Sequence, residues 1–233
     1  MSGAPGASGA APLLEVRHLA KHFGAVQALK DLSMTVSAGE VVAVAGDNGA
    51  GKTTLIKALS GVYRPTSGEI LLEGAPVSFG SPQEARERGI ETIYQDLALA
   101  DNLSIGANIF LGREPMRKAL GFIPVLDRGA MARAARDTMA LLDFHVSRMD
   151  APVSNFSGGQ RQAVAIGRAV HWNARILIMD EPTAALGVQE TAQVEKIIRG
   201  LKERGIPLIL VSHNLRQVFD LVDRIVVFRR GHI

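Results

Sequence analysis

The stretch GDNGAGKTTL, residues 46–55, constrains the fold of this chain more than any other feature. The apolar, β-branched run EVVAVA before it is typical of a parallel strand that is covered on both faces. A helix is predicted to follow, because Leu55, Ala58, Leu59 and Val62 recur at helical spacing. The strand, the glycine-rich turn and the helix together predict a phosphate-binding loop at a helix start.

The turn matches the pattern Gly-x-x-x-x-Gly-Lys-Thr in every fixed position. Bare glycines let backbone N–H groups curl around a phosphate, while Lys52 can reach the β- and γ-phosphates and the Thr53 hydroxyl can ligate Mg²⁺. A glycine-rich turn that ends in a surface lysine is the alternative. We therefore predict a nucleoside triphosphate site formed by Gly46, Asp47, Asn48, Gly49, Ala50, Gly51, Lys52, Thr53 and Thr54.

A second chemical element is RILIMDEP, residues 175–182. Its apolar strand delivers Asp180 and Glu181 to the carboxyl edge, where ligands bind in open α/β sheets. Asp180 can hold Mg²⁺ beside Thr53, and Glu181 can polarise a water for attack on the γ-phosphate. Two acids that cap a turn are the alternative. The long interval back to Lys52 predicts an inserted subdomain.

A third element is NFSGGQRQAVAIGRAV, in which Ser157 is a natural N-cap and Gly158 and Gly159 leave bare N–H groups before a helix. This is a second anion-binding helix start, although the domain already has one phosphate site. We expect two copies to pair head to tail, so that each helix start covers the γ-phosphate bound by the other copy. From SGGQ alone, a simple capped helix is the alternative.

Composition sets the outer limits. A chain of 233 residues that is 47% hydrophobic supports a large α/β domain, or a core with one inserted subdomain. The net charge is +3, and the acidic and basic residues are interspersed along the chain, as expected for a mixed, solvated surface. The lack of cysteine excludes disulfides and thiolate metal sites. Residues 1–12 resemble a flexible tail and not a signal peptide, and no run is long enough to cross a bilayer, so we expect a cytosolic protein.

A coarse reading gives strands at both ends and helices between them. LEVRHL and LSMTV are predicted antiparallel strands, GEILLEGAPV a hairpin that turns near Glu73-Gly74, SPQEARERG a short capped helix and IETIYQ a strand. From about residue 97 to 170 the pattern is helical, and MARAARDTMALLDF carries the clearest stripe.

GDNGAGKT, NFSGGQ, ILIMDEP and VSH, in that order, resemble the nucleotide-binding subunit of an ABC (ATP-binding cassette) transporter over about residues 13–233. The resemblance implies an α/β fold: a RecA-like P-loop NTPase core with a mostly parallel sheet, an N-terminal antiparallel β subdomain and an inserted α-helical subdomain. It also implies Mg²⁺-dependent ATP hydrolysis in a dimer that sandwiches two ATP molecules. The expected divisions are a tail (1–12), the β subdomain and first half of the core (13–96), the helical signature subdomain (97–170) and the second half of the core (171–233).

The resemblance assigns further site residues. Phe23 matches the aromatic residue that stacks on adenine, Gln95 the glutamine that touches Mg²⁺ and the attacking water, and His213 the histidine that contacts the γ-phosphate. Without the family, these would be a core phenylalanine, a turn glutamine and a structural histidine. Catalytic roles are thus expected for Glu181, His213 and Gln95, and contacts to the opposing ATP for Ser157, Gly158, Gly159 and Gln160.

The chain departs from the family pattern at two places. Phe156 stands where leucine is usual, a mild apolar exchange. Ala184-Ala185-Leu186-Gly187 stands where most relatives have Ser-Ala-Leu-Asp, so the hydroxyl and carboxylate that normally communicate with the partner's phosphate loop are missing. Communication across the dimer is therefore expected to differ from that of most relatives.

The segment from SPQEARERG to FLGRE is similar to the ATPases of simple-sugar importers of the ribose, xylose and fructose type. Those ATPases often carry two cassettes, whereas this chain has one and is expected to pair with itself. The implied partners are a second copy, transmembrane permease subunits and a separate extracytoplasmic sugar-binding protein, with no nucleic acid. The implied location is the cytoplasmic face of the membrane, and residues around 98–115 are expected to receive a permease helix unless LSIGANIFLG is helical core.

The rival functions come from other classes. An ABC ATPase that remodels DNA or the ribosome would carry a long coiled coil or cysteine-rich zinc modules, which this sequence lacks. A regulatory module that holds ATP without turning it over is favoured by Gly187 and opposed by Glu181. Because RIVVFRRGHI stops within an expected hairpin, we expect further residues after Ile233.

Overall fold

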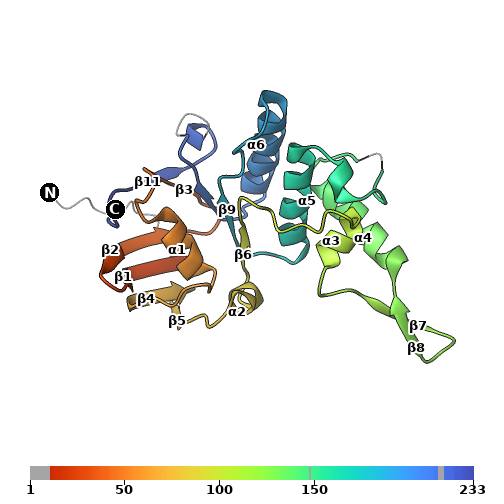
Figure 1. Ribbon diagram of the computed structural model, residues 1–233, viewed down its shortest axis with the longest axis horizontal. Coiled ribbons are helices and arrows are strands. Elements are labelled where there is room, and N and C mark those ends of the chain that lie inside the picture. The colour runs from red at the N-terminus through yellow and green to blue at the C-terminus, as the bar shows by residue number, and fades with distance from the viewer. Residues whose placement is uncertain (1–10, 147, 215–217) are drawn as a thin grey trace.

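The computed structural model describes residues 11–146, 148–214 and 218–233. Figure 1 shows an elongated molecule with a β-rich half, a central sheet and a helical half. The predicted tail falls largely on residues 1–10, which lie outside the described residues. Among the described residues, no helix is both long enough and apolar enough to cross a bilayer.

The β-rich half is an antiparallel sheet in the strand order β2-β1-β4-β5. Strands β1 (Leu14–Phe23) and β2 (Val26–Val36) form one hairpin, and β4 (Ser67–Leu72) and β5 (Ala75–Val77) form another. The sequence prediction for both hairpins is confirmed, including the turn between β4 and β5, where Gly74 has φ 76°.

The central sheet is parallel, in the order β11-β3-β10-β9-β6. Its strands are β3 (Val41–Gly46), β6 (Ile90–Ile93), β9 (Ile176–Asp180), β10 (Leu208–Val211) and β11 (Arg224–Phe228). Strands β3, β9 and β10 are buried almost throughout, as their unbroken apolar runs predict. The predicted fold class, a P-loop core with a β subdomain and a helical insert, is confirmed.

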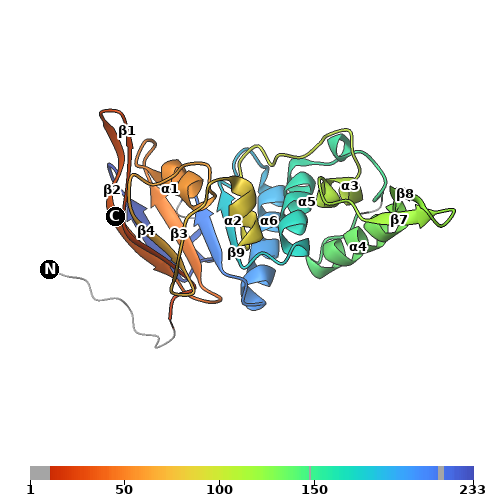
Figure 2. The same ribbon diagram turned by 90° about the horizontal axis from the view of Figure 1, so that it is seen from below.

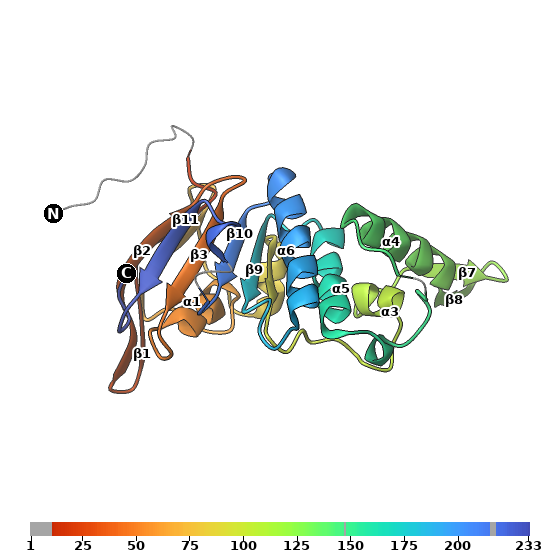
Figure 3. The same cartoon turned by 90° about the horizontal axis from the view of Figure 1, so that it is seen from above.

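The helices divide between the sheet and the insert. Helices α1 (Lys52–Leu59), α2 (Pro82–Glu87) and α6 (Val188–Glu203) accompany the sheets, whereas α3 (Ile105–Phe110), α4 (Arg128–Leu141), a 3-10 turn (Val153–Asn155) and α5 (Gly158–His171) form the helical half. Ser81 caps α2 by accepting a hydrogen bond from the Glu84 N–H, as predicted. Figures 2 and 3 show α5 beside α6, where the insert meets the core.

Two details of the sequence prediction are wrong. Residues 97–170 are not helical throughout, because β7 (Met116–Ala119) and β8 (Ile123–Leu126) form a hairpin between α3 and α4. Pro124 removes a helical donor and the flanking residues are β-branched, so a strand is favoured there. Helix α1 also ends before Val62, which is 42% exposed and not part of the buried stripe.

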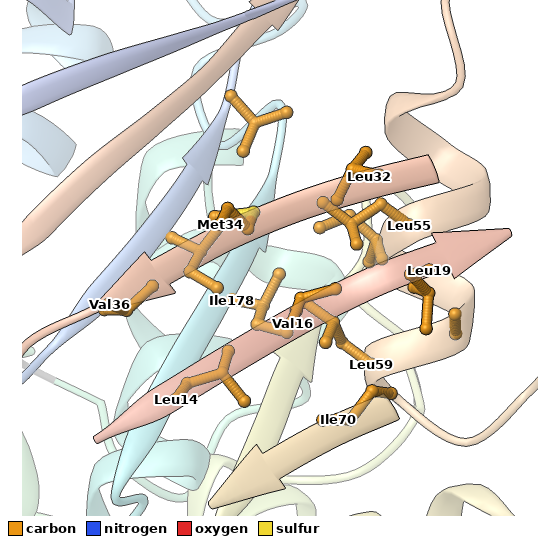
Figure 4. Close-up of a cluster of buried hydrophobic side chains, with 14 of the residues drawn as sticks. Leu14, Val16, Leu19, Leu32, Met34, Val36, Leu55, Leu59, Ile70 and Ile178 are labelled. Carbon is orange, nitrogen blue, oxygen red and sulfur yellow. The ribbon is translucent and has the colours of Figure 1, made fainter. Parts of the chain in front are cut away.

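The parallel sheet is buried on both faces. One face packs with α1 against the antiparallel sheet, and Figure 4 shows Leu14, Val16, Leu55 and Leu59 in that layer. Along β9, Ile178 points into this cluster, whereas the alternating residues Leu177 and Met179 join the cluster formed with α4, α5 and α6. The core therefore holds the strands rigidly while their carboxyl ends stay open to a ligand.

Candidate functional site

The carboxyl ends of β3, β10 and β9 lie side by side and position the site. In the parallel register, Val211 of β10 is paired with Val44 of β3 on one side and with Asp180 of β9 on the other. The glycine-rich loop follows β3, and Glu181 follows β9. The fold thus brings together two motifs that lie far apart in the sequence.

The loop backbone at Gly46 and Gly51 excludes any side chain. Gly46 has φ 143°, and a Cβ built there would lie 2.3 Å from the Phe228 carbonyl oxygen on β11. Gly51 has φ 113°, and its Cβ would lie 2.8 Å from the Ala28 carbonyl oxygen. Glycine is therefore required for the chain to curl between β11 and β2 before α1 begins.

Lys52 is held inside this loop. The residue is only 7% exposed, and its Nζ donates hydrogen bonds to the Gly46 carbonyl at 2.6 Å and to the Asp47 carbonyl at 3.0 Å. These neutral acceptors satisfy part of the ammonium group without neutralising its charge. The loop therefore presents a buried positive charge next to the first N–H groups of α1, which favours a bound anion.

A cavity of about 500 Å³ opens over the loop. The loop from Asn48 to Thr54 lines it, together with Asp180, Glu181 and the side of β2 around Gln27. Nine of the predicted site residues, Asn48, Gly49, Ala50, Gly51, Lys52, Thr53, Thr54, Asp180 and Glu181, share this cavity. An adjoining cavity of about 560 Å³ is lined by Gly46 and Asp47, with Glu181 and His213 on its other side.

Asp180 is a partly buried acid that lacks full charge compensation. Burial and the neighbouring Glu181 carboxylate raise its pKa above the ordinary value, although Lys52 acts in the opposite direction. Asp180 and the exposed Thr53 offer oxygen ligands, which a hard cation such as Mg²⁺ prefers. Among the described residues there is no group of three His, Cys, Asp or Glu side chains that could hold a metal ion.

Glu181 is held in an unusual backbone conformation. It has φ 51°, its N–H donates to the Val211 carbonyl at 2.9 Å, and its Oε1 lies 2.9 Å from the Nδ1 of His213. A left-handed conformation at a residue other than glycine costs about 1–3 kcal/mol and is common at functional sites. The backbone bond and the imidazole contact fix the carboxylate at the rim of the loop.

Two residues named by resemblance lie at the edge of this arrangement. Gln95 is exposed just beyond β6, the strand that pairs with β9, and does not line the cavity over the loop. Phe23 is 43% exposed at the end of β1 and packs edge-on against Tyr63, with ring centroids 5.1 Å apart. Its paired residue Val26 does line the cavity, so Phe23 is close to the site without forming its wall.

The signature residues form a separate helix start. The Ser157 side chain accepts a hydrogen bond from the Gln160 N–H at 3.4 Å, while the Ser157 N–H donates to the Gln160 Oε1 at 3.0 Å. This reciprocal capping box begins α5. None of the four signature residues lines the cavity over the loop of the same chain.

Glu190 is a residue that the sequence analysis missed. Hydrogen bonds from the Ser157 side chain, and then from the backbone of Gly187 and Gly159, lower its pKa. The Gly187 N–H donates to Glu190 Oε2 at 3.2 Å. A Cβ built at Gly159 would lie 3.0 Å from the Glu190 Cβ, so this side chain lies directly over the start of α5. The motif GVQE signals a helix start, but not which neighbouring helix its carboxylate would meet.

Comparisons with known proteins agree with this geometry. A profile described as ABC transporter matches residues 29–184. The chain is 47% identical over 221 residues to a xylose/arabinose import ATP-binding protein of Sulfolobus acidocaldarius, covering 95% of this chain and 86% of that protein. It is also 47% identical over 223 residues to a fructose import ATP-binding protein of Rhizobium meliloti, covering 94% and 86%.

A ribose import ATP-binding protein of Rubrobacter xylanophilus is 46% identical over 95% of this chain, but the match spans only 43% of that longer protein. Among solved structures, an ATP-binding cassette of an ABC transporter in its ADP conformation has a TM-score of 0.82 at 26% identity, covering 96% of this chain and 90% of that one.

Proposed function

The chain belongs to the ABC transporter family of ATP-binding cassettes, and from this membership we propose that it is the ATP-hydrolysing subunit of a simple-sugar importer. The observation that carries the proposal is the shared cavity of the Lys52 loop, Asp180 and Glu181. The sugar assignment is supported by the xylose/arabinose, fructose and ribose import proteins that the chain resembles at 46–47% identity.

In this proposal, each residue acts on the triphosphate from a defined position. The loop N–H groups and Lys52 hold the β- and γ-phosphates, and Thr53 and Asp180 hold Mg²⁺, with Gln95 approaching from the end of β6. Bound Mg²⁺ would neutralise charge on the β- and γ-oxygens. Glu181 orients and polarises the attacking water, and His213, 2.9 Å away, keeps the Glu181 carboxylate at the rim.

We also propose that the working unit is a head-to-tail dimer of this chain. The support is the position of α5, whose capped start offers bare glycine N–H groups outside the cavity of its own chain. In the dimer, Ser157 to Gln160 of one copy would close on the γ-phosphate held by the Lys52 loop of the other. Phe23 would contribute stacking area for the adenine ring.

The proposed partners follow from the import assignment. Membrane permease subunits would take up the force of dimer closure through the helical half, around residues 98–115. A separate extracytoplasmic protein would deliver the sugar to the permease, and this chain would sit on the cytoplasmic face of the membrane.

The test is Mg-ATP hydrolysis by the purified chain over a wide protein concentration range, beside Glu181→Gln. We expect activity per subunit to rise with concentration, because the complete site needs two copies, and to disappear in Glu181→Gln while ATP binding persists. The matched control is Glu203→Gln, the same chemical change at an exposed residue at the far end of α6, which should leave turnover unchanged. ATP binding with no turnover at any concentration, with or without membrane subunits, would favour the regulatory module instead.

A further inference from the structure

The hairpin β7–β8 is a projection that the proposed ATPase cycle does not use. Figures 1 and 2 show it at the far end of the helical half, directed away from the body of the molecule. Within the described part of the chain, β7 and β8 pair only with each other.

The tip of this hairpin is apolar and open to solvent. Leu120 is 83% exposed and Phe122 is 76% exposed, and they flank Gly121 in the turn. Behind the tip, Met116 is 57% exposed and Ile123 is 42% exposed. These large apolar side chains are exposed together on a protrusion and not on a flat face or in a groove. A protrusion of this kind can insert into the surface that it contacts.

The charges around the tip have one sign. Within residues 113–128, all of which the structure describes, the exposed charged side chains are basic. Arg113 stacks on Trp172, 4.8 Å from its ring centroid, which leaves Arg117, Lys118 and Arg128 on and beside the hairpin. The acids of this segment are half-buried and already engaged. Glu114 accepts from the Gly112 N–H at 3.0 Å, and Asp127 caps α4 by accepting from the Ala130 N–H at 2.8 Å. The segment therefore presents an apolar tip with a basic collar, made of Arg117, Lys118 and Arg128, behind it.

We propose that the β7–β8 hairpin docks on an anionic lipid surface, with Leu120 and Phe122 entering the headgroup boundary and the basic collar contacting lipid phosphates. The charge pattern favours a lipid surface over a protein partner, because every exposed charge is positive and the apolar tip is small. A stable protein interface needs about 800 Å² from each partner, more than a single hairpin tip provides. Insertion of a few apolar residues with nearby basic residues matches interfacial membrane anchoring.

Docking of this kind would add a contact beside the permease and orient the helical half toward the membrane. The contact needs neither nucleotide nor dimer, so it can fail or succeed independently of the proposed ATPase function. Each basic side chain near an anionic surface strengthens binding by roughly fivefold, so the loss of two should weaken it by roughly 25-fold at low salt. The apolar contribution should persist at high salt, because salt screens only the charges.

The test is sedimentation of the full chain with phosphatidylcholine vesicles, with and without phosphatidylglycerol, in the absence of nucleotide. We expect binding to the phosphatidylglycerol vesicles and far weaker binding to pure phosphatidylcholine. Two double variants, Leu120→Ser with Phe122→Ser and Arg117→Gln with Lys118→Gln, should each lose at least about tenfold in affinity. Phe219→Ser removes an aromatic side chain that is 68% exposed elsewhere and should bind like the wild type.

Thermal unfolding of every variant should match the wild type, since the substituted side chains are exposed. Failure of the wild-type chain to bind anionic vesicles would overturn the proposal, as would wild-type affinity in both hairpin variants. If the wild type ignores vesicles but the tip variant fails to associate with purified permease, the hairpin is a protein contact and the lipid proposal is wrong.

Discussion

Replacing Gly46 by alanine should test whether the phosphate loop needs glycine because β11 leaves no room for a side chain. In Gly46→Ala, the new Cβ would lie 2.3 Å from the Phe228 carbonyl oxygen, a backbone atom at the end of β11, where that strand pairs with β3. The residue also has φ 143°, a region that side-chain-bearing residues avoid. Backbone strain of about 1–3 kcal/mol and overpacking of about 1–3 kcal/mol together predict a loss of about 2–6 kcal/mol in the free energy of unfolding.

Gly49→Ala is the matched control. Gly49 lies in the same loop with φ 78°, but a Cβ built there meets no atom within 4 Å. Only the left-handed backbone penalty applies, about 1–2 kcal/mol. The difference between the two variants therefore isolates the close approach of the loop to β11 from the cost of a positive φ.

Urea denaturation monitored by fluorescence of Trp172, the one tryptophan of the chain, would measure both losses. With a slope of about 1–3 kcal/mol per molar urea, a further loss of about 2 kcal/mol in Gly46→Ala should lower its midpoint by roughly 1 M relative to Gly49→Ala. Equal midpoints for the two variants would refute the steric argument and show that the loop relaxes away from β11 at little cost.

Three further outcomes are expected. Burial and the neighbouring Glu181 raise the pKa of Asp180 in the folded chain, so the ionised side chain opposes folding at pH values above that pKa. Asp180→Asn should therefore raise the melting temperature of the nucleotide-free chain at neutral pH. This gain in melting temperature should vanish below the ordinary aspartate pKa, where the side chain is protonated in both the folded and the unfolded chain. The fully buried Asn108 side chain accepts a hydrogen bond from the Ala100 N–H and donates to the Ala100 carbonyl. Asn108→Ala should therefore lower the free energy of unfolding, measured with urea, by about 1–3 kcal/mol. Asn108→Asp should lower it further, because a carboxylate would face backbone carbonyls. Glu190→Gln should let ATP-dependent dimers, detected by light scattering, form at lower protein concentration than in the wild type, and an unchanged or higher concentration would contradict this.

The geometry of the candidate site was predictable where it depends only on residues that are adjacent in the sequence. The apolar run of β3, the glycines and Lys52 act locally, so their geometry follows from a few adjacent residues. Asp180 and Glu181 lie beside the loop, as expected, because the carboxyl ends of parallel strands share one edge. The roles assigned to these residues, and to Phe23 and His213, stay predictions, since they depend on a bound nucleotide.

Other features depend on contacts between segments far apart in the sequence and could not be predicted. The β7–β8 hairpin interrupts a region whose flanking helices dominate its periodicity, and only Pro115, Gly121 and Pro124 signal the break. The contact of Glu190 with the start of α5 requires the packing of α5 on α6. Likewise, the demand for glycine at position 46 comes from Phe228 of β11, 182 residues later (228 − 46).

The contact of Glu190 with the start of α5 is best understood together with Gly187, which stands where most relatives have aspartate. With no carboxylate at residue 187, the start of α6 has no side-chain cap, and Glu190 accepts from the Gly187 N–H while also covering the N–H groups at the start of α5. One carboxylate thus serves two helix starts. In the proposed dimer, the γ-phosphate held by the partner would seek the same donors, and two anions cannot share them without strong repulsion. In this proposal, closure of the dimer would require the Glu190 carboxylate to leave the start of α5. Binding of the partner's nucleotide at the start of α5 would thus be linked to a change in the capping of α6.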